Sequence, residues 1–252
     1  MHDAERLIRG LGFFVQDAAP VDALHVAFVR SDHAHAQVLS VDTTDALGLA
    51  GVVAVWQASD VKGVSTPGVN PLWPPFEDVP MPLLAGPCVE HVGQALAMVL
   101  AHDAATAQEA ALLVRVSLQA LPAWGADDPD APLVHQVAHT HGQVGGEVAV
   151  AARVELTVPR LLAMAMEPRA CVAQWQGDSQ RLTVWLGSQT PARAQADIAR
   201  ALGLALNQVH LISPDVGGAF GSKASLSPED ILVALAAHRL RTTVQWKASR
   251  SE

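Results

Sequence analysis

The sequence predicts an α+β fold in two domains, and three observations support this. In the first half, β-rich runs bounded by Asp, Ser and Gly alternate with short helices. In the second half, strands alternate with two helices, of which Pro191–Gly203 has Thr190 as its N-cap and Gly203 as its terminator. Between the halves, Asp127–Gly146 is rich in turn residues and has little periodicity. We therefore expect a first domain over residues 1–125, a linker over residues 126–146 and a second domain over residues 147–252.

Local patterns predict the individual elements. Residues 65–87 are rich in proline, which cannot donate an N–H to a helix or an inner strand, so we expect an irregular loop there. Asp103 fits as the N-cap of an Ala-rich helix, and Ser227 as the cap of a helix over residues 228–240. The expected strands cover residues 23–31, 35–43, 51–60, 94–101, 114–121, 147–158, 170–176, 181–187 and 207–215, with a hairpin turn around Gly177 and Asp178.

Composition and charge exclude several classes of protein. The net charge is −9 and Lys and Arg do not cluster, which argues against a nucleic-acid partner. No apolar run reaches the length of a membrane span. Cys88 and Cys171 lie far apart without metal-ligand spacing, so we expect two buried thiols rather than a zinc site or a disulfide. The N-terminus shows no secretory signal, and these features together favour a cytoplasmic protein.

The stretch SPDVGGAFGSK, residues 213–223, raises the question of what approaches so bare a backbone. Glycines serve where the chain needs a positive φ or a close approach, and a loop between a strand and a helix presents N–H groups to anions. A P-loop is excluded, because Ser222 stands where Gly is required and Ala224 where Ser or Thr is required. The spacing also fails the G-x-G-x-x-G dinucleotide motif. On the loop alone, a tight connection without a ligand is an equal alternative.

Gln189 lies at the end of another predicted strand, directly before a helix. Ligands of α/β proteins gather at the carboxyl ends of strands, so Gln189 and the glycine loop, residues 217–223, could face one pocket. Taken alone, a glutamine at such a place is more commonly a cap or a surface residue.

Three segments, in this order and spacing, resemble one family: MEPRACVAQW, LTVWLGSQTPARAQADIARALGL and VHLISPDVGGAFGSK. They are similar to the molybdenum-binding subunit of molybdenum hydroxylases, the superfamily of xanthine dehydrogenase, aldehyde oxidase and aerobic carbon monoxide dehydrogenase. The MEP segment looks more like the carbon monoxide and aldehyde-oxidising branch. The first half, including RLIRGLGFFVQD and EHVGQALAMVLAHDAATAQEAALLVRVSLQALPA, resembles the family's a/b hammerhead domain. The resemblance covers nearly the whole chain. It implies a hammerhead domain followed by the first, incomplete part of the molybdenum-binding α/β domain.

The resemblance also implies roles for individual residues. Gln189 matches the family glutamine that hydrogen-bonds an oxygen ligand of molybdenum, and Lys223 matches a lysine of structural role. The loop that lies beside the molybdenum and its pterin dithiolene matches four residues, Gly218, Ala219, Phe220 and Gly221, with Ala219 standing where glycine is commonest. Gln189 and Phe220 would lie near the molybdenum without being its ligands.

For the reaction, the resemblance implies hydroxylation of an aldehyde, an N-heterocycle or a similar small molecule with oxygen derived from water. The cofactor would be molybdopterin, as the cytosine dinucleotide, with 2Fe-2S and FAD on an iron–sulfur subunit and a FAD subunit. The family's general-base glutamate lies far downstream of the loop, so no catalytic residue is assigned here. We therefore expect second-half strands without all their sheet partners, a complementary molybdenum-binding chain, and an inactive isolated chain. The alternatives are a truncated, inactive remnant or partner-binding fragment, and a stand-alone small-molecule-binding α/β protein.

Other polar residues have structural explanations. Glu167 of the MEPR segment is expected in a salt bridge or a cap rather than at a reacting centre. His33 and His35 have a spacing that suits a metal on a strand, but the same residues resemble a hammerhead feature, so we expect no metal there. The linker histidines, His135, His139 and His141, are expected to meet solvent.

Overall fold

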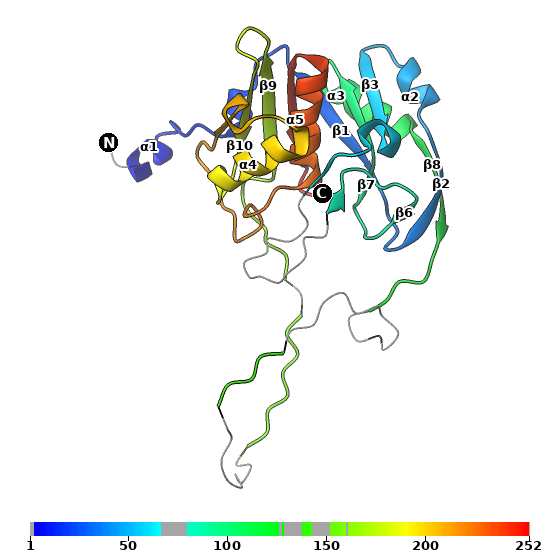
Figure 1. Ribbon diagram of the computed structural model, residues 1–252, viewed down its shortest axis with the longest axis vertical. Helices are drawn as coiled ribbons and strands as arrows, with labels where there is room; N and C mark the ends of the chain where they lie inside the picture. Colours follow the sequence, from blue (N-terminus) through cyan, green and yellow to red (C-terminus); the bar gives the residue numbers. More distant parts are fainter. Residues whose placement is uncertain are drawn as a thin grey trace. The chain divides into compact units, whose positions relative to one another are not determined.

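The computed structural model describes residues 3–66, 80–125, 128, 138–142, 152–159 and 161–251. The chain divides into two units, residues 1–121 with 163–252, and residues 122–162. All helices and strands of the described residues belong to the first unit (Figure 1). Among these residues no helix is long and apolar enough to cross a membrane.

The first unit contains five α-helices, three 3₁₀ helices and twelve strands among the residues that the structure describes. The helices are α1 (Asp3–Ile8), η1 (Val15–Ala18), α2 (Thr44–Gly48), η2 (Ala58–Val61), α3 (Ala104–Leu113), α4 (Pro191–Leu202), η3 (Leu206–Gln208) and α5 (Pro228–Leu240). The strands are β1 (Leu24–Arg30), β2 (Ala36–Asp42), β3 (Val52–Gln57), β4 (Ser65–Thr66), β5 (Met81–Pro82), β6 (Cys88–Val89), β7 (Ala95–Ala101), β8 (Arg115–Ala120), β9 (Ala170–Gln176), β10 (Arg181–Leu186), β11 (Val209–Ile212) and β12 (Thr243–Lys247).

One seven-stranded sheet joins both halves of the sequence. Its strand order is β11-β10-β9-β12-β1-β7-β3, so β12 lies between the second-half hairpin and the first-half strands. Within it, β12 runs parallel to β1, pairing Val244 with Leu24, and antiparallel to β9, pairing Trp246 with Cys171. We expected the second-half strands to lack sheet partners. This is wrong for β9, which pairs with β12 on the side away from β10. A smaller sheet, β6-β2-β8, and the pair β4-β5 complete the strands (Figure 1).

The large sheet is apolar on both faces because helices cover both. Along β7, Met98 and Leu100 join the cluster that packs under α4 and α5, whereas Ala97 and Val99 join the cluster under α2 and α3. Successive side chains of a strand point to opposite faces of the sheet. A strand covered on both faces therefore needs apolar residues at every position rather than at every second one. All seven residues of β7 are buried, and the expected buried strand is confirmed.

Most predicted elements are confirmed, although Thr190 and Ser227, which occupy the expected N-cap positions, make no side-chain cap hydrogen bond. Asp103 accepts a hydrogen bond from the Thr106 N–H at 2.8 Å, and Gly203 ends α4 with φ +66°. Two expectations are wrong. Residues 152–158 form no strand. The proline-rich stretch, residues 65–87, is not irregular throughout, because β4 and β5 within it pair with each other. Its residues 67–79 lie outside the described part. Residues 143–151 lie outside it as well, and the sequence interpretation missed α1, β6 and β12.

The N-terminal segment before β1 is held by polar contacts from its two ends. Arg6 donates two hydrogen bonds to Asp215, from Nη1 to Oδ2 and from Nη2 to Oδ1, each at 2.6 Å. The Phe13 N–H donates to Asp215 Oδ2 at 2.8 Å, and the Asp215 N–H donates to the Phe13 carbonyl at 2.9 Å. Further on, Val15 of η1 is buried against β9. We call residues 6–13 the N-terminal arm. The arm is thus hydrogen-bonded to Asp215, which precedes the glycine loop.

The Asp215 carboxyl gives a prediction about pH. Its hydrogen bonds from Arg6, and then from the Phe13 N–H, lower its pKa from 3.8 to about 2. A carboxyl with a lowered pKa contributes stability above its unfolded pKa and loses it as the pH falls through the folded value. We expect the contact to persist at pH 4 and to be lost toward pH 2. The NMR shift of the Asp215 carboxyl carbon should titrate near 2, and at a higher pH in Arg6→Gln, where the Phe13 N–H still lowers the pKa but Arg6 no longer does. An unchanged midpoint in that variant would contradict the assignment.

Candidate functional site

The two strand-end junctions singled out in the sequence lie side by side. The Gln189 N–H, at the end of β10, donates to the Lys223 carbonyl at 3.0 Å, at the far end of the glycine loop. The Thr190 hydroxyl donates to the Ala224 carbonyl at 2.7 Å. Before the loop, the Ser188 N–H donates to the Ser213 hydroxyl at 3.2 Å. The parallel pairing of β10 with β11 produces this arrangement, because the carboxyl ends of parallel neighbours meet at one edge.

The glycine loop needs its glycines for two different reasons. Gly218 and Gly221 have φ values of +99° and +88°, in the region that side chains disfavour. Gly217 is required for space, because a Cβ atom there would lie 2.5 Å from the Cβ of Glu167. Phe220 also has a positive φ, +50°, although it carries a ring. A non-glycine residue in this region is held there by its surroundings at a cost of about 1–2 kcal/mol, so the contacts around the loop must fix it.

Glu167 supplies the main contacts that fix the loop. Its Oε2 accepts hydrogen bonds from the Gly217 N–H at 2.8 Å and from Lys223 Nζ at 2.7 Å. Its backbone N–H donates to the Gly217 carbonyl at 3.0 Å, and its carbonyl accepts from Lys223 Nζ at 3.1 Å. The Lys223 side chain is only 3% exposed and that of Glu167 15%. One carboxylate therefore ties both ends of the loop together, which confirms the structural roles expected for Glu167 and Lys223.

Arg169 extends the support to the residues after the loop. Its Nη2 donates to the carbonyls of Ser222 and, at 2.9 Å, Ser225, while Nη1 donates to Asp230 Oδ2 at 2.8 Å. Asp230 is fully buried in α5, and burial raises its pKa while the Arg169 charge opposes the rise. The guanidinium thus links the loop to α5, whose first turn is fixed by the Ser227 N–H donating to the same carboxylate at 2.8 Å.

The outer side of the loop carries donors without acceptors. Among the described residues, no acceptor is present for four consecutive backbone N–H groups, those of Gly218, Ala219, Phe220 and Gly221. The Gln189 carboxamide is exposed and also lacks a partner in this part of the chain, and the Phe220 ring is 77% exposed. Unpaired N–H groups on the loop and an exposed carboxamide on the segment that bonds to it fit a ligand rich in oxygen atoms, and the exposed Phe220 fits a flat, partly apolar group.

Exposed apolar side chains surround the loop. Met164 and Met166 precede Glu167 and are 56% and 87% exposed, and Val216 and Phe13 are also exposed. Beside them lies a mostly apolar recess of about 360 Å³. Its lining residues are Phe14, Gln16, Met166, Glu167, Pro168, Ala170, Gly217 and Lys247. The sequence interpretation missed this apolar surface, although the run LLAMAM before Glu167 was its signal. An exposed apolar surface of this kind beside unsatisfied donors is typical of an interaction surface.

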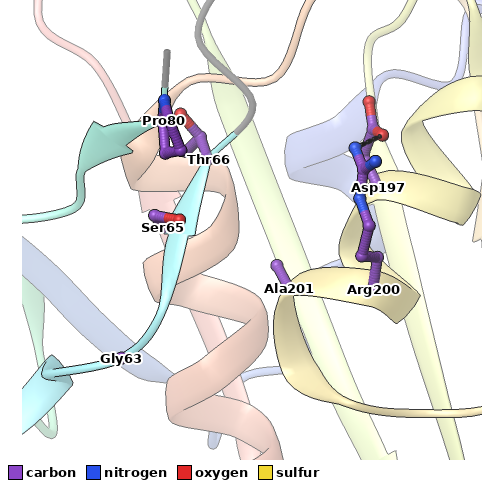
Figure 2. A pocket seen from close by; sticks show the side chains of 7 residues that line it. All are labelled: Gly63, Ser65, Thr66, Pro80, Asp197, Arg200 and Ala201. Carbon is purple, nitrogen blue, oxygen red and sulfur yellow. Dashed lines mark hydrogen bonds and ion pairs between the residues drawn. The ribbon is translucent and has the colours of Figure 1, made fainter. Parts of the chain in front are cut away.

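A second recess of about 260 Å³ lies elsewhere in the same unit. Figure 2 shows Asp197 and Arg200 of α4 on one side and Ser65 and Thr66 of β4 on the other. Asp197 accepts from Arg200 Nη2 at 2.7 Å, so the charges in this recess satisfy each other. Two of its lining residues, Thr66 and Pro80, flank in the sequence the residues 67–79 that lie outside the described part, and we assign no site to it.

The remaining predicted residues are structural or lie at the surface. His33 contacts Asp32 at 2.6 Å, and the described residues hold no cluster of three metal-ligating side chains, so the preference against a metal at His33 and His35 stays a prediction. His139 and His141 are exposed as expected, whereas His135 lies outside the described residues. Cys171 is buried, which raises the pKa of its thiol, but Cys88 is only half-buried, so the expectation of two buried thiols is wrong for Cys88.

Comparison with known sequence families gives two matches. Residues 9–122 match the a/b hammerhead domain of aldehyde oxidase and xanthine dehydrogenase. Residues 130–252 match the molybdopterin cofactor-binding domain. The glycine loop, Gln189 and the supporting Glu167 and Lys223 all lie in the second match.

Individual relatives are similar over almost the whole chain. The nicotine 6-hydroxylase large subunit of Paenarthrobacter nicotinovorans is 32% identical over 98% of this chain, which spans 32% of that subunit. The carbon monoxide dehydrogenase large chain of Afipia carboxidovorans is 30% identical over 98% of this chain and 34% of its own length. Quinoline 2-oxidoreductase from Pseudomonas putida 86 superposes with a TM-score of 0.77 at 31% identity, over 98% of this chain and 34% of that one. The chain thus spans about a third of the relatives it matches.

The Glu167–Lys223 pair gives a prediction about stability. Glu167→Gln leaves the buried Lys223 ammonium without its carboxylate, so we expect the free energy of unfolding to fall by about 3 kcal/mol. Adding Lys223→Met should recover part of the loss, because the uncompensated charge is removed. Urea unfolding measures both. Arg115→Gln, in the exposed pair with Asp45, is the control and should change stability by less than about 1 kcal/mol. A loss as small as the control's in Glu167→Gln would contradict the role of this pair.

Gly217 gives a second prediction. Gly217→Ala should destabilise the fold by about 1–3 kcal/mol, because its Cβ would clash with Glu167 and push the carboxylate off Lys223. Gly177→Ala is the matched control, since a Cβ there meets nothing within 4 Å and its φ is not positive. Equal unfolding midpoints for the two variants would show that the loop does not pack closely on Glu167.

Proposed function

Because the chain belongs to the molybdopterin-binding large-subunit family of xanthine dehydrogenases, aldehyde oxidases and carbon monoxide dehydrogenases, we propose that it forms one wall of a molybdenum cofactor pocket. In this proposal the pocket belongs to a hydroxylase that oxidises an aldehyde, an N-heterocycle or a similar small molecule. A complementary molybdenum-binding chain would supply the rest of the pocket. An iron–sulfur subunit and a FAD subunit would accept the electrons.

The observation that carries the proposal is the row of backbone donors in the glycine loop. The N–H groups of residues 218–221 have no acceptor among the described residues, and the exposed Gln189 carboxamide, on the segment that bonds to Lys223, has no partner there either. Such donors fit the oxygen atoms of a molybdopterin cofactor, in the cytosine dinucleotide form that we propose. When bound, the molybdenum centre supplies the two-electron oxidation of the substrate.

The chain's own residues would bind and orient rather than transfer protons. Gln189 would donate a hydrogen bond to an oxygen at the metal, and Phe220 would cover the pterin side of the loop. Two carboxylates lie near the loop. Glu167 Oε2 already accepts from Lys223 and from the Gly217 N–H, and both oxygens of Asp215 accept from Arg6. A carboxylate held this way is a poor general base, because its oxygens are already occupied by donors within the chain. We therefore propose that the base comes from the complementary chain and that the isolated chain is inactive.

The competing proposal is a remnant that retains the fold and at most binds a partner. Both proposals explain the exposed apolar residues around the loop. They differ in whether the donors of residues 218–221 still meet a cofactor.

The first test is native mass and molybdenum content of the chain purified from its own host. A complex heavier than 26.5 kDa with about one molybdenum per chain is the expected result. A metal-free monomer or an aggregate would favour the remnant.

A second prediction concerns Gln189. In the purified complex, Gln189→Ala should lower the affinity for the molybdenum cofactor by roughly tenfold, as expected for one lost hydrogen bond to a ligand. Gln37→Ala, at an exposed position on β2, is the control and should retain its molybdenum. Equal molybdenum contents and turnover in both variants would remove Gln189 from the site.

A further inference from the structure

We infer that the N-terminal arm, residues 6–13, positions the glycine loop, with Arg6 and Asp215 as positioning residues. Asp215 lies two residues before Gly217, so the direction in which the chain enters the loop is set at this residue. The inference rests on the proposed function only for its consequence, which is cofactor binding. The positioning itself concerns contacts within this chain.

The contacts between the arm and Asp215 are reciprocal. Both carboxylate oxygens of Asp215 are occupied by Arg6 at 2.6 Å, and Oδ2 also accepts the Phe13 N–H at 2.8 Å. In the other direction, the Asp215 N–H donates to the Phe13 carbonyl at 2.9 Å. Arg6 additionally donates to the Leu11 carbonyl at 3.0 Å, which fixes the curve of the arm. A paired guanidinium and two main-chain hydrogen bonds hold both the side chain and the backbone at position 215.

The arm can resist movement because it is anchored beyond Phe13. Val15 is 1% exposed and packs in a cluster with Ala170 and Val172 of β9. Gln16 donates to the Trp246 carbonyl of β12 at 3.3 Å. The arm therefore connects the start of the loop to the central strands of the large sheet. By contrast, α1 at its other end is an exposed helix at the edge of the unit (Figure 1).

The loop needs such a constraint on its entry side. Gly217 and Gly218 give the backbone many alternative conformations, and Phe220 is held in a region that disfavours a side chain. Glu167, Lys223 and Arg169 restrain the loop from within and from its exit. On the entry side, the described side-chain contacts are those of Ser213 and Asp215, and the contacts of Asp215 lie nearer to Gly217. Without them, the donors of residues 218–221 would sample several directions.

The test is amide hydrogen exchange in the full chain with Arg6→Gln. Two amides report separately: that of Asp215, which bonds to the arm, and that of Gly217, which bonds to Glu167. Losing a bidentate charged hydrogen bond should speed exchange of both by roughly tenfold. Arg6→Lys keeps a cation and should restore part of the protection. Arg9→Gln is the matched control, because Arg9 pairs with Glu5 at the exposed surface, and both amides should keep their rates.

A global structural role is distinguished by urea unfolding. The Arg6–Asp215 contact contributes stability of its own, so the urea unfolding midpoint of Arg6→Gln should fall slightly below that of Arg9→Gln. Exchange of the Gly217 amide should nevertheless rise more than exchange of the buried amides of β7, which report global unfolding. Faster exchange at Asp215 with an unchanged rate at Gly217 would overturn the inference, since the arm would then be a tether that leaves the loop in place. Unchanged rates at both amides would overturn it as well.

Cofactor binding separates this inference from the proposed function. In the purified complex, Arg6→Gln should release molybdopterin cytosine dinucleotide several-fold faster than Arg9→Gln. If the wild-type complex holds no cofactor, the proposed function fails, but the Gly217 exchange rate still decides whether the arm positions the loop. If the cofactor is held and its release is equal in both variants, the inference fails while the proposed function stands.

Discussion

The buried ion pair between Glu167 and Lys223 is the interaction on which the candidate site depends. A loop with glycines at positions 217, 218 and 221 has a large conformational entropy to lose, and its own side chains offer little burial to offset the loss. One carboxylate that binds the first glycine N–H and the lysine after the last glycine closes the loop on itself. Because the Lys223 side chain is 3% exposed, neither charge can return to water without opening the whole loop. The pair therefore couples the conformation of the loop to the folding of the residues around it.

The second constraint is β12, which makes one sheet out of two sequence regions. Its pairing with β9 and with β1 means that the hammerhead match and the cofactor-binding match share a hydrogen-bonded ladder and a common apolar core. Any displacement of the first-half strands would therefore reach β9 and β10 through the ladder. Since β10 leads to Gln189 and β9 follows Glu167, the first half contributes to the position of a site that contains none of its strand residues.

Residues 152–158 and β12 have the same sequence pattern, but only β12 forms a strand. Both alternate apolar and polar residues, but residues 152–158 were predicted as a strand and β12 was not. In the structure β12 has a partner on each side, whereas Val154, Leu156 and Val158 are at least 75% exposed. Alternating apolar and polar residues indicate that a segment suits a half-buried strand. Whether it forms one depends on partner strands, which only the tertiary structure provides. Helices were predicted better because their caps are local, as Asp103 shows. The loop and Glu167 were found by their motif, but the arm's contact with Asp215 spans the sequence and has no local signal.

The exposed apolar side chains and the unpaired donors around the loop have one physical explanation. A hydrogen bond from an N–H of residues 218–221 to an anionic ligand contributes little while water competes at the same place, because the dielectric screening is high. Covering Phe13, Met166 and Phe220 with another apolar surface removes that water and strengthens each donor at the same time. The hydrophobic gain of association would then offset the cost of desolvating the ligand. Under the proposed function, the loop, whose shape is already fixed by contacts within the chain, would become a strong binding site only in an assembly that buries it.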